Sequence, residues 1–335
     1  MTALLLEIDD LHVEFPTRAG LVQAVRGVSV TVSRGETVGI VGESGSGKSV
    51  TSQAVFGIVD APGRVSGGDV RWKGKSIIHG KEAARALKKI RGKEIAMIFQ
   101  DPMSSLDPLF TIGVQIGEGL RHHLGFSRRQ AAERTLELLD LVGIPSPRQR
   151  AGQYAHEFSG GMRQRVLIAM ALACEPELLI ADEPTTALDV TVQAQILDLL
   201  KDVQSKLGLA VLLISHDLGV IADFCERVTV MYGGKVLESA QATDLFTSPA
   251  SPYTLGLLRA MPRHDIVAER LVAIEGSPPD LRDPPPGCPF EPRCERATEV
   301  CRAQMPSFES VRPDHLVACF HAEIPSADKV LVNHG

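Results

Sequence analysis

Hydrophobic positions along this chain follow two periods, one typical of strands and one typical of helices. Residues 4–33 alternate apolar and polar side chains in short runs such as 28–32, which predicts half-buried strands. The runs at 37–41, 178–181 and 210–214 are mainly aliphatic and predict buried strands. Because strands that alternate with helices form parallel sheets, we expect a parallel sheet here.

Helical patterns separate these strands. We expect helices at 50–58, 81–91 and 190–207, and further strands at 69–72 and 95–99. The stretch from residue 101 to about 174 differs, because it is helical throughout and interrupts the alternation. Apolar side chains within it recur at spacings of three and four, as on one face of a helix, at Ala132, Leu136, Leu139 and Val142. We therefore expect 101–174 to form an inserted helical subdomain.

Composition sets the broad class of the protein. A chain of 335 residues suggests about two domains. Proline and turn residues become frequent after about residue 249, so we expect one domain at 1–250 and a C-terminal extension at 251–335. The hydrophobic content of 44% supports a packed core, and the net charge of −6 disfavours a nucleic-acid partner.

The same composition bears on location. No apolar run approaches the ~20 residues that cross a bilayer. Residues 1–10 lack the basic start of a secretory signal. We therefore expect the chain in the cytoplasm, where cysteines stay reduced.

A glycine-rich motif follows the strand expected at 37–41. It fits the pattern G-x-x-x-x-G-K-[ST], and a strand, loop and helix in this order aim backbone N–H groups and a helix dipole at an anion. Lys48 is expected to reach the β- and γ-phosphates of a nucleoside triphosphate, and Ser49 to bind Mg²⁺. A plain glycine-rich turn is the alternative, which the flanking strand and helix disfavour. The expected nucleotide-binding residues are Gly42, Glu43, Ser44, Gly45, Ser46, Gly47, Lys48, Ser49 and Val50.

Two further segments carry candidate chemistry. An aliphatic run ends in Asp182 and Glu183, and the carboxyl edge of a sheet would bring these side chains beside the phosphate loop. Asp182 is expected to hold Mg²⁺ and Glu183 to polarise the attacking water as a general base, with a solvated acidic turn as the alternative. Ser159, Gly160 and Gly161 open a helical run and form either a second anion site or an ordinary N-cap.

At these motifs the chain resembles the ATP-binding cassette (ABC) family. Residues 42–49 are similar to its Walker A loop, 178–183 to its Walker B strand and 158–162 to its signature sequence, with Phe158 and Met162 replacing the common Leu and Gln. Three further positions match the family's Q-loop glutamine, D-loop and switch histidine, namely Gln100, Ala187-Leu188-Asp189 and His216.

The resemblance implies a fold and a mechanism. The fold class is α/β, a P-loop NTPase cassette with a mixed sheet, an antiparallel β subdomain and an inserted helical subdomain, followed by a small irregular cysteine-containing domain. Two cassettes pair head to tail, so that each ATP lies between the Walker A loop of one and Ser159-Gly160-Gly161 of the other.

The resemblance also assigns roles to single residues. Phe15 stacks on adenine, unless it is a core residue, and Asp189 borders the nucleotide. The catalytic residues are Lys48, Gln100, Glu183 and His216, and the Mg²⁺ ligands are Ser49, Gln100 and Asp182.

The second half of the chain narrows the resemblance to the peptide-importer branch, which also includes nickel importers. The strings that carry it are 99–108, 181–195 and Ser251-Pro252-Tyr253-Thr254 followed by Leu257-Leu258. Four cysteines of the extension follow the spacing C-x5-C-x6-C-x17-C, at Cys288, Cys294, Cys301 and Cys319.

Clustered cysteines in a reducing compartment indicate metal rather than disulfides. Four thiolates ligate zinc or a [4Fe–4S] cluster, and the loose spacing without tight C-x2-4-C pairs favours the cluster, as does the resemblance. Zinc and unligated thiols stay open as alternatives. Cys174 and Cys225 stand alone in apolar surroundings and are expected in the core.

The function implied by the resemblance is that of the ATPase subunit of a di- or oligopeptide importer, peripheral at the cytoplasmic face of the membrane. Its partners would be a second, different cassette subunit, two membrane permeases and an extracellular or periplasmic substrate-binding protein. Nickel, glutathione or another small solute is the alternative cargo. A soluble cassette protein of translation or DNA repair, or a redox-sensing module with a vestigial ATPase, is the alternative function.

Overall fold

The computed structural model describes residues 3–101, 105–186, 188–261 and 274–323 of the chain. The chain divides into two compact units. The helical unit comprises residues 1–5, 32–36 and 79–213, and the phosphate-loop unit comprises residues 6–31, 37–78 and 214–335. Pro102, Met103 and Ser104 of the peptide-importer string, and Ala187 of the D-loop, lie outside the described residues.

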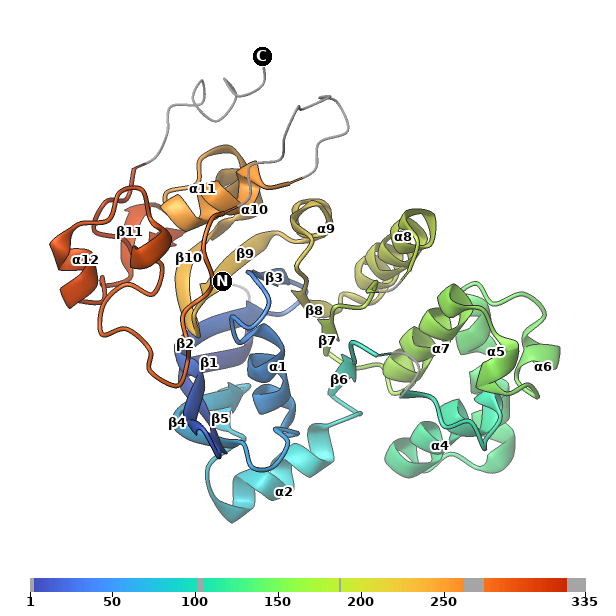
Figure 1. Ribbon diagram of the computed structural model, residues 1–335. Coiled ribbons are helices and arrows are strands. Elements are labelled where there is room, and N and C mark those ends of the chain that lie inside the picture. The colour runs from blue at the N-terminus through green and yellow to red at the C-terminus, as the bar shows by residue number, and fades with distance from the viewer. Residues whose placement is uncertain (1–2, 102–104, 187, 262–273, 324–335) are drawn as a thin grey trace. The chain divides into compact units, whose positions relative to one another are not determined.

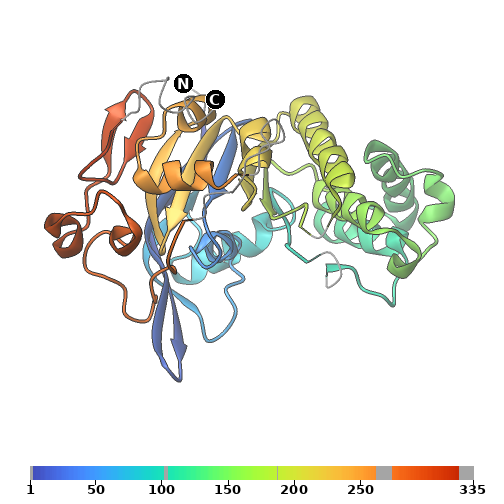
Figure 2. The same cartoon turned by 45° about the horizontal axis from the view of Figure 1, so that its top comes forward.

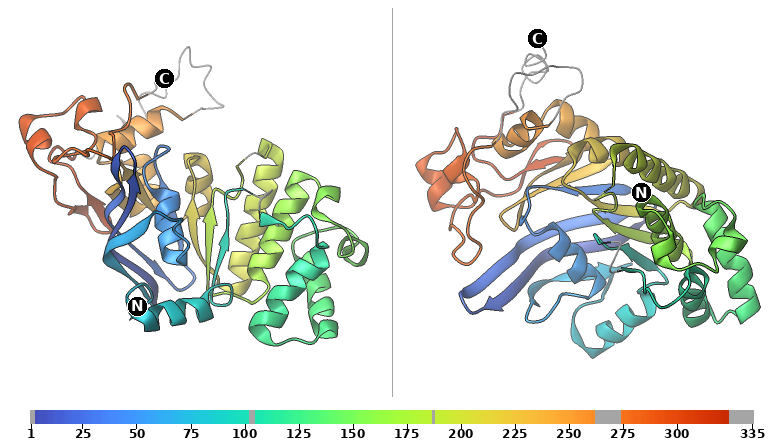
Figure 3. Two further views of the ribbon diagram at one scale, coloured as in Figure 1. Left: turned by 60° about the horizontal axis from the view of Figure 1, so that its bottom comes forward. Right: turned by 45° about the vertical axis from the view of Figure 1, so that its right-hand side comes forward.

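The helical unit combines a short parallel sheet with a group of helices. Its strands follow the order β8-β7-β6, and β6 pairs in parallel with β7. Helices α4, α5 and α7 pack against one another, as Figures 1 and 3 show. The elements are α2 (Gly80–Ile90), β6 (Ile95–Ile98), α4 (Ile112–Leu124), α5 (Arg128–Leu141), α6 (Pro147–Arg150), η1 (Ala155–Glu157), α7 (Gly160–Leu172), β7 (Leu178–Asp182), α8 (Val190–Leu207) and β8 (Ala210–Ile214).

Helix α5 begins at a capping box. The Ser127 hydroxyl accepts the backbone N–H of Gln130, and the Gln130 side chain accepts the N–H of Ser127. The expected apolar face of this helix is partly wrong, because Ala132 is exposed whereas Ala131 and Leu138 are buried. A spacing of three and four fits two adjacent faces of a helix, and the packing of α4 and α7 selects the one that is buried.

The phosphate-loop unit holds two sheets. One has the order β2-β1-β4-β5, with β4 antiparallel to both β1 and β5. The other has the order β11-β12-β10-β9-β3, with β3 parallel to β9 and the remaining pairs antiparallel. The elements that form these sheets are β1 (Leu4–Thr17), β2 (Gly20–Ser33), β3 (Thr37–Val41), β4 (Arg64–Trp72), β5 (Lys75–Ser76), β9 (Arg227–Tyr232), β10 (Lys235–Gln241), β11 (Glu309–Arg312) and β12 (His315–Val317).

Helices and short turns complete this unit. All five residues of β3 are buried, which explains why it is a continuous apolar run rather than an alternating one. The helical elements are α1 (Lys48–Phe56), α9 (Leu218–Phe224), α10 (Ala242–Thr247), α11 (Pro252–Arg259), η2 (Glu291–Arg293) and α12 (Glu299–Ala303).

The expected mixed α/β fold is confirmed. The strand at 210–214 and the helix at 190–207 have the expected bounds, and the sheets contain both parallel and antiparallel pairs.

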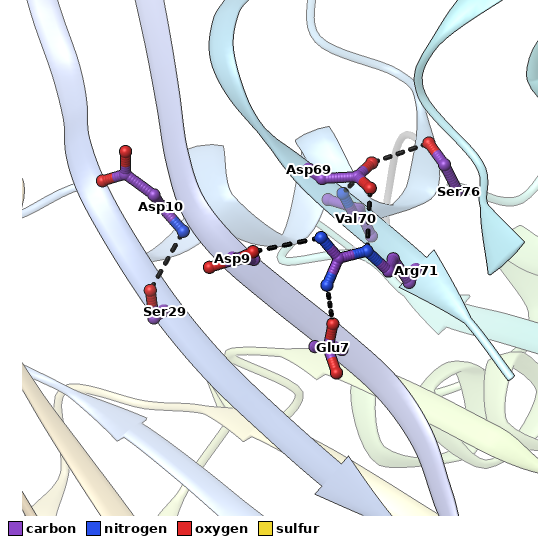
Figure 4. Close-up of polar contacts among 8 residues, drawn as sticks. All are labelled: Glu7, Asp9, Asp10, Ser29, Asp69, Val70, Arg71 and Ser76. Atoms are coloured by element: carbon purple, nitrogen blue, oxygen red, sulfur yellow. Dashed lines mark hydrogen bonds and ion pairs between the residues drawn. The ribbon is translucent and has the colours of Figure 1, made fainter. Parts of the chain in front are cut away.

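Charged side chains join β1 to β4 on one face of the four-stranded sheet (Figure 4). The guanidinium of Arg71 donates to Asp69, at 3.0 Å, and to Asp9, at 3.1 Å, and forms a third ion pair with Glu7. Asp69 in turn accepts the hydroxyl of Ser76 at 2.6 Å. One cation thus offsets three carboxylates that would otherwise repel one another on neighbouring strands.

The C-terminal region continues the second sheet. Strand β12 pairs with β10, with Val317 opposite Glu238, and in Figures 1 and 2 the orange-red segment lies beside β10. Beneath this pairing His315 donates to the carboxylate of Glu238 at 2.7 Å, and both side chains are fully buried. The backbone N–H groups of Ala250 and Ser251 also donate to this carboxylate, at 2.7 and 3.0 Å.

Candidate nucleotide-binding site

The phosphate loop connects β3 to α1, as expected from its motif. Lys48, the first residue of α1, is 6% exposed and donates from Nζ to the carbonyl oxygens of Gly42 and Glu43, at 2.8 and 3.0 Å. The loop is therefore curled around the lysine, with the N-terminus of α1 at its centre. Such an arrangement can bind the phosphates of a nucleotide.

Two glycines of this loop cannot be replaced without moving the backbone. Gly42 has φ of +148°, and a Cβ there would lie 2.0 Å from the carbonyl oxygen of Met231. Gly47 has φ of +98°, and its Cβ would lie 2.4 Å from the carbonyl oxygen of Ala24. The loop thus lies directly against the backbone of its neighbours, which fixes its curvature.

One polar atom of the loop lacks a protein partner. The hydroxyl of Ser46 is buried and makes no hydrogen bond within the described residues. Because a buried polar group is normally satisfied, this hydroxyl is suited to a ligand oxygen. The loop therefore fits a phosphate both in shape and in donors.

The carboxyl end of β7 holds the second expected constellation. Asp182 is the last residue of the strand and is 3% exposed. Glu183 follows with φ of +48°, a left-handed conformation that costs a non-glycine residue of the order of 1–3 kcal/mol and is found at functional sites. The side-chain amide of Gln100 and the hydroxyl of Thr186 both donate to Oε2 of Glu183, at 3.0 and 2.9 Å.

Gln100 and Glu183, which the sequence analysis singled out separately, therefore lie together. Thr186 was not singled out from the sequence, although its spacing of three residues from Glu183 could have suggested a contact. Two donors on one carboxylate oxygen hold the Glu183 side chain in a defined orientation.

The signature segment lies beside the D-loop. Ser159 caps α7, because its hydroxyl accepts the N–H of Met162, which is the arrangement considered as the alternative to an anion site. A Cβ on Gly161 would lie 2.6 Å from the Val192 side chain, so this glycine allows α7 and α8 to approach. Asp189 is the N-cap of α8 and accepts the N–H of Val192. Ser159 and Gly160 are both exposed.

Two expected residues lie elsewhere in the phosphate-loop unit. His216 is exposed in the turn between β8 and α9. Phe15 is half-buried near the end of β1, and a Cβ on Gly63 would lie 2.4 Å from its ring. Its ring thus packs on the backbone of Gly63.

The site residues accordingly divide between the two units. The phosphate loop, Phe15 and His216 belong to the phosphate-loop unit, whereas Gln100, Asp182, Glu183, Asp189 and the signature segment belong to the helical unit.

The four cysteines of the extension converge. All four line one cavity of about 20 Å³, together with His321 and Phe290. Burial raises the pKa of Cys288 to about 11, and it also raises the pKa values of Cys294 and Cys319 above their ordinary range. Neighbouring thiols add to each of these shifts. These three shifts favour the neutral thiol over the thiolate at Cys288, Cys294 and Cys319.

The four thiols are a soft donor set, of the kind that zinc and iron–sulfur clusters take. Among the described residues, no group of three or more His, Cys, Asp or Glu side chains is placed to hold a metal ion. The predicted ligation of iron–sulfur or zinc is therefore not supported by this arrangement. Cys174 and Cys225 are buried, as expected for core residues.

The helices of the described residues include no candidate membrane span. Within the described parts of the chain, every helix is too short or too polar to span a bilayer.

Comparison with known families gives two matches. Residues 25–186 match the sequence profile of the ABC transporter family. Residues 237–301 match the profile of the oligopeptide/dipeptide transporter C-terminal region, which covers the first three clustered cysteines.

Comparison with curated proteins gives relatives over almost the whole chain. The dipeptide transport ATP-binding protein DppD of Bacillus subtilis is 51% identical over 317 residues, which cover 94% of each chain. The oligopeptide transport ATP-binding protein OppD of Salmonella typhimurium is 50% identical over 317 residues, covering 95% of this chain and 93% of the relative.

Solved structures show the same fold. The dimeric post-hydrolysis state of the ATP-binding cassette MJ0796, bound to ADP and Pi, has a TM-score of 0.63 and 28% identity, covering 71% of this chain and 98% of the other. CbiO1 from Clostridium perfringens, part of an ABC transporter complex, has a TM-score of 0.62 and 27% identity, covering 73% and 91%.

Proposed function

This chain belongs to the ATPase subunits of the ABC transporter family and carries the oligopeptide/dipeptide C-terminal region, and we propose that it hydrolyses ATP to energise peptide uptake. The observation that carries the proposal is the phosphate loop, curled around Lys48 with the unpartnered hydroxyl of Ser46. The near-complete similarity to peptide transport ATP-binding proteins supports the cargo class.

The chemistry is phosphoryl transfer to water, which needs positioning and charge neutralisation more than covalent catalysis. Lys48 and the loop N–H groups would hold the β- and γ-phosphates. Ser49, Gln100 and Asp182 would hold Mg²⁺, which when bound neutralises phosphate charge. Glu183, oriented by Gln100, would orient the attacking water and take its proton.

We propose that a second cassette completes the site. The exposed Ser159-Gly160 end of α7 would contact the γ-phosphate bound by the partner cassette, and Asp189 would border the interface. His216, exposed after β8, would contact the γ-phosphate held by its own chain, and Phe15 would stack on adenine. The dimeric state of the similar cassette MJ0796 supports such pairing.

The remaining partners follow from the importer class. We propose that two membrane permeases bind the cassettes at the cytoplasmic face of the membrane and that a substrate-binding protein delivers the cargo. The second cassette would be a related but different chain. Nickel or glutathione stays an alternative cargo, because the permeases and the binding protein select the ligand.

We also propose that the four clustered cysteines hold a [4Fe–4S] cluster, with zinc as the alternative. The support is the donor chemistry, four thiols on one cavity. Protein purified without oxygen should be brown and contain one cubane's worth of iron and sulfide. A colourless preparation with stoichiometric zinc, or without metal, would contradict the cluster.

The catalytic proposal is tested with Glu183→Gln and Lys48→Ala in the assembled transporter. Glu183→Gln should retain ATP but lose about 10²–10⁴-fold in turnover, because the base is removed while the phosphate contacts remain. Lys48→Ala should weaken nucleotide binding itself. Labelled-nucleotide binding and phosphate release measure the two effects.

The matched control is Glu175→Gln, an exposed carboxylate of the helical unit that pairs with Arg134. It should hydrolyse ATP at the unaltered rate. Normal hydrolysis by the Glu183→Gln transporter would remove the assigned base. Fractionation with membranes and permeases separates a transporter subunit from a soluble cassette protein.

A further inference from the structure

A buried arginine of the C-terminal region reaches the phosphate loop. Arg293 lies between Cys288 and Cys294 in the sequence, and its side chain is 5% exposed. Its Nη1 and Nη2 donate to the two carboxylate oxygens of Glu43, at 2.6 and 3.0 Å. Glu43 is the second residue of the phosphate loop, about 250 positions earlier in the chain.

The guanidinium has no hydrogen-bonding capacity left for a ligand. Besides Glu43, it donates to the hydroxyl of Tyr232 at 3.0 Å and to the carbonyl oxygens of Ile274 and Glu275, at 3.0 and 2.8 Å. Five N–H donors thus meet five acceptors, the full number that arginine offers. Arg293 is therefore a fixed structural link rather than a vacant anion site.

A second contact fixes the backbone of the same loop residue. The N–H of Glu43 donates to the hydroxyl of Tyr253 at 3.0 Å, and Tyr253 is fully buried. The rings of Tyr232, Tyr253 and Phe290 pack together with centroids 4.5–5.4 Å apart. Both the side chain and the backbone of Glu43 are therefore held by residues that the C-terminal region supplies or covers.

The end of β9 lies between the loop and this region. A Cβ on Gly233 would lie 2.9 Å from Pro289 on one side, while the carbonyl oxygen of Met231 lies against Gly42 on the other. The loop can therefore shift little without moving the segment 288–294. Lys48 donates to the carbonyl oxygen of Glu43, so the position of Glu43 bears directly on the phosphate-binding lysine.

We propose that Arg293 is a positioning residue for the phosphate loop, so that the affinity of the cassette for ATP depends on how segment 288–294 is seated. The inference rests on the proposed nucleotide-binding function. It deepens that function by assigning to the C-terminal region a part in nucleotide affinity. Cys288 and Cys294 lie at the two ends of this segment, so the same geometry connects the state of these two cysteines to the loop.

The test compares nucleotide affinity and turnover in the full chain. Arg293→Met keeps the aliphatic stem and removes the charge, and it should raise the Kd for MgATP about tenfold, within the range typical of coupled sites. Turnover at saturating ATP should stay unchanged, because the loop contacts substrate and transition state alike. Arg293→Lys, which can keep one bond to Glu43, should recover part of the affinity.

A double-mutant cycle with Glu43→Gln identifies the route. If Arg293 acts through Glu43, Arg293→Met should weaken binding by less than twofold in the Glu43→Gln background. The matched control is Arg282→Met, which removes a similar bidentate pair with Asp280 on the exposed surface of the same region. It should leave the Kd unchanged.

The outcomes separate this inference from the proposed function. Failure of the unaltered chain to bind MgATP would overturn the proposed function itself. Unaltered affinity in Arg293→Met, or an equal loss in both Glu43 backgrounds, would overturn the positioning role alone. If Arg293→Met does not fold, Glu43→Gln alone decides: it removes the carboxylate that Arg293 binds, and an unchanged Kd would overturn the proposal.

Discussion

The buried pair of Glu238 and His315 tests how firmly the C-terminal region is joined to the rest of its unit. The Glu238 carboxylate accepts three hydrogen bonds, from the His315 ring and from the N–H groups of Ala250 and Ser251. These donors come from β12 and from the segment that precedes α11. One side chain thus connects β10 to both parts of the region.

Glu238→Ala should lower the free energy of unfolding by about 3–5 kcal/mol, because three buried donors lose their acceptor. Each loss costs about 1–3 kcal/mol, and relaxation partly offsets the sum. Glu238→Gln should cost less, since its amide keeps one acceptor oxygen. Its NH₂ group would still face a donor, so we expect about 1–3 kcal/mol.

Urea unfolding followed by tryptophan fluorescence measures this effect directly. The chain contains one tryptophan, Trp72, which lies in β4 of the same unit and is 4% exposed. The control is Glu309→Ala, an exposed carboxylate of β11, which should change stability by less than about 0.5 kcal/mol. An unfolding midpoint of Glu238→Ala equal to that of Glu309→Ala would refute the reasoning.

Three further predictions concern single positions. Burial raises the pKa of the Cys225 thiol far above its ordinary value, so iodoacetamide at pH 8 should leave Cys225 unlabelled in the native protein and label it only in urea. Because the raised pKa favours the neutral thiol in the fold, the protein should lose stability as the pH rises above the ordinary pKa of a thiol. Gly42→Ala should abolish nucleotide binding and lower the melting temperature, since its Cβ would overlap the carbonyl of Met231, whereas Gly45→Ala, with open space around its Cβ, should cost only about 1–2 kcal/mol of backbone strain. Asp189→Ala should lower stability by about 1 kcal/mol in calorimetry through loss of the α8 cap, and Asp189→Asn should restore it.

The regular elements could be predicted because their signals are local. The strand at 37–41 is apolar at almost every position because it is buried on both faces. The helix at 190–207 is bounded by a capping aspartate and by Gly208, which adopts φ of +62°. The register of α5 could not be predicted, because the choice between its two apolar faces depends on the helices that pack against it.

The site residues likewise divide into features that the sequence could predict and features that it could not. The motifs single out Gln100 and Glu183 separately, and the hydrogen bond between the two side chains is visible only in the structure. The four clustered cysteines line one cavity, but their spacing could not show whether they are placed to hold a metal, and within the described residues no metal-holding group is found. Spacing constrains which residues can meet, whereas ligation depends on how the intervening loops fold.

Arg293 carries no motif of its own, and nothing in its spacing points to a glutamate about 250 residues away. Its role emerges only when the sheet brings β9 and the C-terminal region together beside the phosphate loop. A bidentate, largely buried pair between Arg293 and Glu43 carries the desolvation cost of two charges, which the fold can meet only if all five guanidinium donors are satisfied. Since a pair of hydrophobic residues would fill this space at lower cost, stability alone does not account for the choice of residues. Placement of the phosphate loop accounts for this choice, because a bidentate contact between a guanidinium and a carboxylate fixes both their distance and their direction. That argument predicts that Arg293→Met and Glu43→Leu together should fold about as stably as the unaltered chain while still binding MgATP more weakly. Restored affinity in this double variant would show that packing, rather than the charged contact, positions the loop.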